Sequence, residues 1–156
     1  MIPTKAGAMI IFVSVNLKHL FKCQRNYAWP RPQCCPRCRM MRPWGHGFSL
    51  AYFDDLPAGV YLRRYRCPQC SCIIRLRPKG YFPRFQAAIG AIRASLSQRI
   101  CGGGYLPRFS ASRQRHWLAA LRRQVAARLG NQWGGGLVAA FDNLLAAGWV
   151  PVTSAI

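Results

Sequence analysis

The sequence predicts an α+β protein in which a small antiparallel sheet precedes a helical region. Two C-P-x-C units and short runs of β-branched and aromatic residues occupy the middle of the chain. The last part is instead rich in alanine, leucine and arginine, which favours helix. These shifts in composition divide the 156 residues into segments 1–30, 31–80 and 81–156. We expect a strand and a short helix in the first segment, the sheet in the second and helices in the third.

The first segment contains an apolar run from Ala6 to Val15. A membrane span needs about 20 residues, so this run is too short to cross a bilayer. No small-residue cleavage site follows it, so we expect a cytoplasmic protein rather than an exported one. The β-branched and aromatic residues of Met9–Val15 favour a buried strand, and a short helix is expected at Leu17–Phe21. Both would pack on the central sheet.

Three strands are expected in the middle segment. The runs His46–Phe53 and Val60–Arg66 have strand composition, and Asp54–Gly59 between them supplies the Asp, Pro and Gly of a turn. A third strand, Cys72–Arg77, follows the second cysteine pair. This hairpin arrangement would bring the second C-P-x-C unit back beside the first.

Three amphipathic helices are expected in the last segment, at Arg84–Ile100, Ser112–Leu129 and Gly136–Ala147. In each of them apolar residues recur at helical spacing along one side. Ser110 or Ser112 would cap the second helix. Three such helices can bury a common core as helix-turn-helix domains do, or they can form an ordinary small bundle. The pattern leaves both arrangements open, and we describe the region as helix-turn-helix-like.

The strongest local signal is the repeated C-P-x-C unit, which comprises Cys35 and Cys38 and then Cys67 and Cys70. A spacing of two residues lets a tight turn, or knuckle, direct both sulfurs at one ion, and two knuckles supply the four thiolates of a tetrahedral zinc site. Four thiolates leave no coordination position open for chemistry. We therefore expect a zinc ribbon with one structural Zn²⁺, whose binding energy contributes to folding.

The remaining cysteines leave alternatives open. Cys34 and Cys72 flank the proposed ligands and could replace one of them, as could His46. Cys23 and Cys101 are expected to be small buried side chains. A disulfide framework is disfavoured because eight cysteines in 156 residues fall below the density of disulfide scaffolds. A redox dithiol is disfavoured because both pairs lie beside hairpins rather than at a strand-to-helix junction.

The charge balance indicates a polyanionic partner. The chain has 23 Lys and Arg against three Asp and no Glu, which gives a formal net charge of +20. Nucleic acid is favoured over a membrane surface, since the planar guanidinium of arginine suits phosphate. The same count disfavours enzymes that need clustered or paired carboxylates, because Asp54 and Asp55 are neighbours in a turn and Asp142 lies far away. We therefore expect no enzyme activity.

Aromatic or aliphatic residues alternate with arginines in the segment Tyr61–Phe85, and further basic residues occur on the helix expected at Ser112–Leu129. On a strand, Arg64 and Arg66 point to one side, whereas Arg63 points to the other with Tyr61 and Tyr65. Such arginines can grip phosphates, and an exposed tyrosine can stack on a base; alternatively, the aromatic side chains pack inward. If the second helix enters a major groove, its first residues would read bases. The predicted nucleic-acid-binding residues are Arg63, Arg64, Arg66, Arg75, Arg77, Lys79, Arg113, Arg115, Arg122 and Arg123.

The motifs "CPRC", "WGHGF" and "YLRRYRCPQC", followed by "SRQRHWLAALRR", resemble an uncharacterised bacterial family of insertion-sequence-associated zinc-ribbon proteins. They are also similar to the zinc-ribbon and helix-turn-helix front end of many transposases. The resemblance covers roughly Trp29 to Arg123, with Arg39 and Ser71 standing where glycine often follows a knuckle. It implies DNA binding near mobile elements. It does not imply strand transfer, since no acidic catalytic domain follows.

The favoured function is thus a non-catalytic, zinc-containing DNA-binding protein that acts as an accessory or regulator of a transposable element. A transposase or a second copy of the chain is the expected protein partner. Two alternatives remain open. One is an RNA-binding or ribosome-associated zinc ribbon, and the other is an interaction module in which the apolar faces of the last two helices dock a partner protein.

Overall fold

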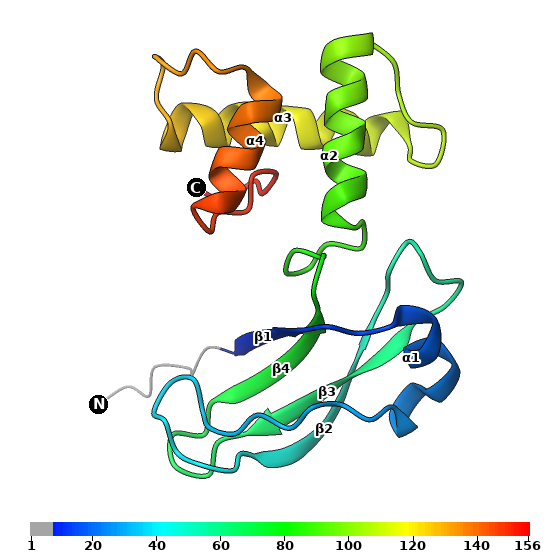
Figure 1. Ribbon diagram of the computed structural model, residues 1–156, viewed down its shortest axis with the longest axis vertical. Helices are drawn as coiled ribbons and strands as arrows, with labels where there is room; N and C mark the ends of the chain where they lie inside the picture. The colour runs from blue at the N-terminus through cyan, green and yellow to red at the C-terminus, as the bar shows by residue number, and fades with distance from the viewer. Residues whose placement is uncertain (1–7) are drawn as a thin grey trace. The chain divides into compact units, whose positions relative to one another are not determined.

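The computed structural model describes residues 8–156, and the chain divides into two compact units, Met1–Ala87 and Ala88–Ile156 (Figure 1). The first unit contains a four-stranded sheet and helix α1, and the second contains helices α2, α3 and α4. The α+β class agrees with the prediction. Residues 1–7 of the predicted N-terminal segment lie outside the described residues.

The sheet has the strand order β1-β4-β3-β2. Its strands are β1 (Met9–Val13), β2 (Trp44–Ala51), β3 (Val60–Arg66) and β4 (Ile73–Pro78). β2, β3 and β4 are antiparallel neighbours, as predicted, whereas β1 pairs with β4 in parallel. The sheet is therefore mixed, which corrects the expected antiparallel one. β1 joins the free edge of β4, where both strands satisfy backbone groups that would otherwise be unpaired.

One side of the sheet carries the core cluster that contains the cysteines. The buried cluster there consists of Cys35, Tyr65, Cys67, Cys72, Ile74 and Leu76, with Ile11, Val13, Trp29, Cys38 and Cys70 packed against it. Helix α1 (Leu17–Cys23) follows β1 and buries Leu20, and the Asn16 side chain caps its start by accepting a hydrogen bond from the backbone N–H of His19 (3.1 Å). A short 3₁₀ turn, Gln24–Asn26, ends the helix. The cysteines are thus part of the core rather than an addition to it.

The helix expected at Arg84–Ile100 begins five residues later, because α2 spans Ile89–Ser97. Arg84 adopts a left-handed backbone conformation (φ 66°), which a right-handed helix cannot contain. In addition, the Arg77 guanidinium donates to the backbone carbonyls of Phe82 (3.2 Å) and Phe85 (2.6 Å). These contacts hold residues 82–85 in an irregular segment.

The second unit packs three helices around an apolar core. α2 continues as a π-helical turn at Gln98–Gly102, and α3 (Ala111–Arg128) and α4 (Leu137–Ala146) follow. The Ser110 side chain accepts from the backbone N–H of Arg113 (3.2 Å) and so caps α3. The apolar faces of the helices supply a buried core that includes Ile92, Leu96, Trp117, Leu121, Phe141 and Leu144.

The helix connections in this unit are long. Residues 103–110 and 129–136 separate the helical segments, eight residues in each case. The turn of a helix-turn-helix motif has three or four residues. The three expected helices are present, and their assignment as a helix-turn-helix stays a prediction. Within residues 8–156, no helix combines the length and the apolar composition that crossing a membrane requires.

Candidate functional site

The first C-P-x-C unit lies in a tight turn that two backbone hydrogen bonds define. The N–H of Cys35 donates to the carbonyl of Met40 (2.8 Å), and the N–H of Arg39 donates to the carbonyl of Cys35 (2.9 Å). An isolated antiparallel bridge between Cys34 and Met41 closes the base of this turn. Cys34 is therefore one of the residues that hold the turn together.

The second C-P-x-C unit lies in the connection between β3 and β4 and repeats the same pattern. The N–H of Cys67 donates to the carbonyl of Cys72 (3.0 Å), and the N–H of Ser71 donates to the carbonyl of Cys67 (3.1 Å). Position by position, these bonds match those of the first turn. We call the two segments, 35–40 and 67–72, the cysteine turns.

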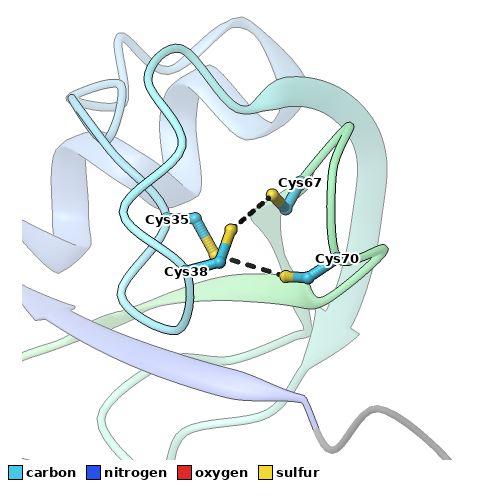
Figure 2. A group of neighbouring side chains, drawn as sticks. All are labelled: Cys35, Cys38, Cys67 and Cys70. Atoms are coloured by element: carbon cyan, nitrogen blue, oxygen red, sulfur yellow. Dashed lines mark hydrogen bonds between the residues drawn. The ribbon is translucent and has the colours of Figure 1, made fainter.

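The cysteine turns bring four sulfurs together, as Figure 2 shows. The Sγ atoms of Cys35, Cys38, Cys67 and Cys70 all lie within 4.8 Å of one another. The shortest distances across the two turns are 3.4 Å between Cys38 and Cys67 and 3.7 Å between Cys35 and Cys70. All four cysteines are free thiols. One metal ion can therefore be held between residues that are 35 positions apart in the chain.

The electrostatics of the group favour a cation among the sulfurs. Burial raises the pKa of Cys67, but hydrogen bonds from the backbone N–H groups of Cys70 and Gln69 outweigh it and bring the pKa to about 6. The backbone N–H of Met40 lowers the pKa of Cys38, but burial and the neighbouring sulfurs outweigh that bond and raise it to about 12. Four thiolates this close repel one another, and a bound cation supplies the missing counter-charge.

The three alternative ligands do not join this group within the described part of the chain. Cys34 is half-buried beside the first turn, Cys72 is fully buried with its thiol 3.6 Å from the carbonyl of Ile73, and His46 is exposed on β2. Cys101 is exposed, so the expectation that it is a small buried side chain was wrong. It lies near the end of the π-helical turn Gln98–Gly102, immediately before three glycines.

Arg63 and the two tyrosines of β3 pack against other side chains. The guanidinium of Arg63 lies over the rings of Phe48 (4.8 Å) and Tyr65 (5.5 Å), and that of Arg25 lies over Tyr61 (4.4 Å). Tyr65 is buried, with 6% of its surface exposed. The contacts place Arg63 on the same side as the tyrosines, as alternation along the strand predicts. The ring of Tyr65 is buried, and that of Tyr61 is half-buried under Arg25.

Arg64, Arg66 and Arg75 lie on the other side of the sheet. Arg64 pairs directly with Arg75 across β3 and β4, so Arg75 lies on the same side as Arg64 and Arg66. Arg66 and Arg75 are exposed, and Arg66 makes a long contact of 3.4 Å with the Ser71 hydroxyl. Arg64 is half-buried, and its Nε–H is buried without a hydrogen-bond partner.

Arg77 and Lys79 differ in what they can offer a ligand. The bonds of Arg77 to the carbonyls of Phe82 and Phe85 occupy its guanidinium, and burial lowers its pKa. The Arg77 guanidinium therefore makes its hydrogen bonds within the protein. Lys79 follows β4 and is exposed, and only its backbone N–H is engaged, with the carbonyl of Val13 (2.9 Å).

The basic residues predicted on the second helix lie on α3. Arg113 is half-buried, with its guanidinium over the rings of Phe109 (5.3 Å) and Trp117 (5.0 Å). Arg115 and Arg122 are exposed and seven residues apart, so they lie two turns from each other on one side of the helix. Arg123 is also exposed. The open basic side of α3 thus consists of Arg115, Arg122 and Arg123.

Two exposed aromatic residues next to the arginines were not predicted from the sequence. Trp44 on β2 pairs with Arg66 and is 63% exposed, and Phe12 on β1 is 38% exposed. A bulge between Gly45 and Phe48 adds a residue to β2, so the alternation of side chains changes sides at that point. Simple alternation counted back from Ser49 would therefore put Trp44 on the wrong side of the sheet. Phe12 lies in an apolar run that has no alternation to indicate its side.

Comparison of the chain with known proteins gives no relative. No protein-family model matches, and the search of curated proteins and the search of solved structures each return no significant match. Function is therefore inferred from the chain's own residues.

Proposed function

We propose that this protein is a non-catalytic, zinc-containing DNA-binding protein built on a zinc ribbon. The observation that carries the proposal is the convergence of the four sulfurs beside an arginine-rich sheet. A tetrahedral Zn²⁺ with Zn–S bonds of about 2.3 Å places its sulfurs about 3.8 Å apart. The distances of 3.4 and 3.7 Å across the cysteine turns are close to that value. Each turn then corresponds to one knuckle of the ribbon.

A structural role for the metal follows from the donor set. Four thiolates fill a tetrahedral shell and leave no position for water or substrate. A dication with four thiolates also carries a net negative charge, which suits a chain with a net charge of +20. Three of the sulfur-bearing side chains in the core cluster, Cys35, Cys67 and Cys72, are fully buried, so the metal would cross-link the centre of the first unit.

Metal analysis of the purified protein tests the zinc site. One zinc per chain is expected, and the substitutions Cys35→Ser and Cys67→Ser should each abolish it. Cys101→Ser is the matched control, because this cysteine is exposed and belongs to the other unit. Iron in place of zinc, or a full metal content in Cys67→Ser, would contradict the assignment, since tetrahedral sulfur sites also accept iron.

The DNA-binding part of the proposal rests on where the arginines lie. Exposed guanidinium groups occur both on the sheet, at Arg66 and Arg75, and on α3, at Arg115, Arg122 and Arg123. The few carboxylates are engaged: Asp142 accepts two hydrogen bonds from Arg93, and Asp55 accepts one from the Tyr81 hydroxyl. The basic charge is therefore available to phosphates.

Salt dependence of DNA binding tests this part. The logarithm of the association constant should fall linearly with the logarithm of the salt concentration, with a slope of about −0.9 for each neutralised duplex phosphate. Removing Arg122 and Arg123 together should make the slope shallower. Affinity that does not change with salt would refute phosphate binding.

The setting at a transposable element, with a transposase or a second copy of the chain as partner, is proposed from the sequence resemblance. The competing role as a protein-interaction module relied on free apolar faces of the last two helices. In the second unit these faces are buried, with Leu121, Phe141 and Leu144 fully inaccessible. Light scattering of the free protein tests self-association, and co-purification with the transposase of a neighbouring element tests the other partner.

A further inference from the structure

One side of the sheet is open in part: Val60 and Leu62 on this side are buried, whereas Trp44, Arg66 and Arg75 on it are exposed. The core cluster and the cysteine turns lie on the side of Ile11, Tyr65, Ile74 and Leu76. Residues that pair across strands share a side, and side chains alternate along each strand. The registers therefore place another set of side chains opposite the core. From this set we define the open face, which consists of Ile10, Phe12, Trp44, Ser49, Leu62, Arg64, Arg66, Arg75 and Arg77.

A shallow cavity brings together some of these residues. It has a volume of about 310 Å³, and its lining includes Ile10, Ser49, Leu62 and Arg75, which come from all four strands. Volumes of about 300 to 1,000 Å³ are usual for small-molecule sites. The cavity thus has room for one small planar group beside a guanidinium, over an apolar floor.

The strands supply no acidic side chain to neutralise the arginines of the open face. Arg64 lies directly opposite Arg75, and like charges in that position destabilise a sheet. None of the four strands contains an acidic residue, and Asp54 and Asp55 of this unit lie in the connection between β2 and β3. The buried Nε–H of Arg64 also lacks an acceptor. A bound anion would relieve the repulsion between the guanidinium groups.

Exposed rings flank the arginines at both edges of the sheet. Trp44 on β2 is 63% exposed beside Arg66, and Phe12 on β1 is 38% exposed beside Arg77. Ile10, paired with Arg75, is 36% exposed. Proteins that bind single-stranded nucleic acid combine aromatic side chains, on which bases stack, with basic side chains that pair with the phosphates.

The width of the open face distinguishes between single and double strands. Four strands about 4.8 Å apart span about 14 Å between the outer two. The major groove of B-DNA is about 12 Å wide and admits a helix or a two-stranded ribbon. A four-stranded sheet cannot enter it, so rings on this face reach bases only when the bases are unpaired.

We propose that the open face binds single-stranded nucleic acid, with Arg64, Arg66 and Arg75 on the phosphates, Trp44 and Phe12 stacked on bases, and one base in the cavity beside Arg75. The inference rests on the proposed nucleic-acid-binding function and names the form of the ligand. DNA and RNA single strands share the chemistry involved, and the experiment separates them.

The test measures binding of a labelled strand of about 15 nucleotides, as DNA, as RNA of the same sequence, and as the DNA duplex, by fluorescence anisotropy. All ligands and variants are compared at one salt concentration, and the single strand is then titrated over a series of salt concentrations. Trp44→Ala should weaken single-strand binding roughly 5- to 150-fold, the effect of losing one stacked base. Arg75→Ala should also weaken single-strand binding. In this variant the slope of the logarithm of the association constant against the logarithm of the salt concentration should become shallower by about one, which corresponds to the loss of one phosphate contact. Duplex binding should change much less in Trp44→Ala.

Two control variants match these changes. Trp149→Ala removes another exposed tryptophan, which is 44% exposed and belongs to the second unit. Arg25→Ala removes a positive charge from beside Tyr61, on the opposite side of the sheet. Both should retain single-strand binding within a few-fold. Metal content and thermal midpoint, measured for every variant, show that the fold is intact.

The outcomes separate this inference from the proposed function. Binding to no nucleic acid at all would overturn both. Binding to duplex and single strand that Trp44→Ala, Phe12→Ala and Arg75→Ala leave unchanged would overturn the open face alone. Selective loss of single-strand binding in these variants supports the inference, and a preference between the two strands then identifies DNA or RNA as the ligand.

Discussion

Arg39 and Ser71 stand at equivalent positions of the two cysteine turns, and both adopt the left-handed backbone conformation, with φ values of 65° and 58°. Each donates its backbone N–H to the carbonyl of the first cysteine of its turn. The sequence resemblance proposed above leads us to expect glycine at these two positions. The structure gives the physical reason, since residues with a Cβ are strained in this region.

Arg39→Gly and Ser71→Gly should therefore stabilise the protein. A non-glycine residue in this conformation costs roughly 1–2 kcal/mol, and the greater freedom of glycine in the unfolded chain offsets part of the gain. We expect the free energy of unfolding to rise by up to about 1 kcal/mol for each change, measured by denaturant titration. Arg37→Gly is the control, because Arg37 lies in the same turn without a positive φ, and it should bring no gain. An equal effect at positions 37 and 39 would argue against the strain.

Removing the metal should melt the first unit and leave the second folded. The core cluster beside the sheet contains the cysteines themselves, so loss of the ion removes the cross-link between the cysteine turns and leaves four thiols at its centre. The second unit has its own apolar core around Phe141. After treatment with a strong chelator, hydrogen exchange should become fast for the amides of β3 and β4 and stay slow for those of α3. Equal protection of β3 before and after chelation would contradict a structural role for the metal.

Gln114→Ala should destabilise the second unit strongly. Gln114 is 1% exposed, accepts from the hydroxyl of Ser95 (2.7 Å) and the N–H of Leu106 (2.9 Å), and donates to the carbonyls of Leu106 (2.8 Å) and Phe109 (2.9 Å). The substitution leaves several buried groups unpaired, each of which costs about 1–3 kcal/mol, so we expect a loss of about 3 kcal/mol or more in thermal or denaturant unfolding. Gln132→Ala, at an exposed position, is the control and should have little effect.

The second unit should lose stability in acid through Asp142. The Arg93 guanidinium donates two hydrogen bonds to Asp142 (2.7 and 2.6 Å) and holds the pKa of that carboxyl below its ordinary value of 3.8. Because the pKa is lower in the folded state, the pair stabilises the fold above pH 3.8 and loses that contribution as the pH falls through this value and below. The effect is small, since both side chains are nearly half exposed.

Asp142→Asn tests this assignment. The variant should show a flatter dependence of the free energy of unfolding on pH between about pH 5 and pH 3 than the unchanged protein. Helical circular dichroism during denaturant titration measures it. Identical slopes for the two proteins would show that the Arg93–Asp142 pair does not contribute.

The candidate metal ligands were predictable because their signal is local. The C-P-x-C spacing forms one tight turn wherever it occurs, and two copies select Cys35, Cys38, Cys67 and Cys70 over the neighbouring Cys34 and Cys72. The strand Val60–Arg66 was equally predictable, since residues of strand composition follow the Asp-Pro-Gly turn signals directly. Helix α3 follows from its periodic apolar residues and from the serine before it.

The phase and the ends of other elements depended on contacts that the local pattern does not contain. The bulge between Gly45 and Phe48 puts Trp44 on the side of Arg66, against simple alternation. The sequence predicts that Arg77 binds phosphate, but its guanidinium instead donates hydrogen bonds to the carbonyls of Phe82 and Phe85. These bonds hold that segment in an irregular conformation, and α2 starts only at Ile89. A side chain's internal hydrogen bonds cannot be read from its position along a strand.

The amino-acid sequence by itself determined the α+β class, the basic character and the four sulfurs, because composition and short-range spacing decide them. Only the tertiary structure decided that β1 lies parallel to β4 and that Arg64 faces Arg75. Strand partners and register are set by contacts between distant segments, which compete for the same free edge and the same core. Those contacts turn two separate arginine pairs into one surface flanked by Phe12 and Trp44.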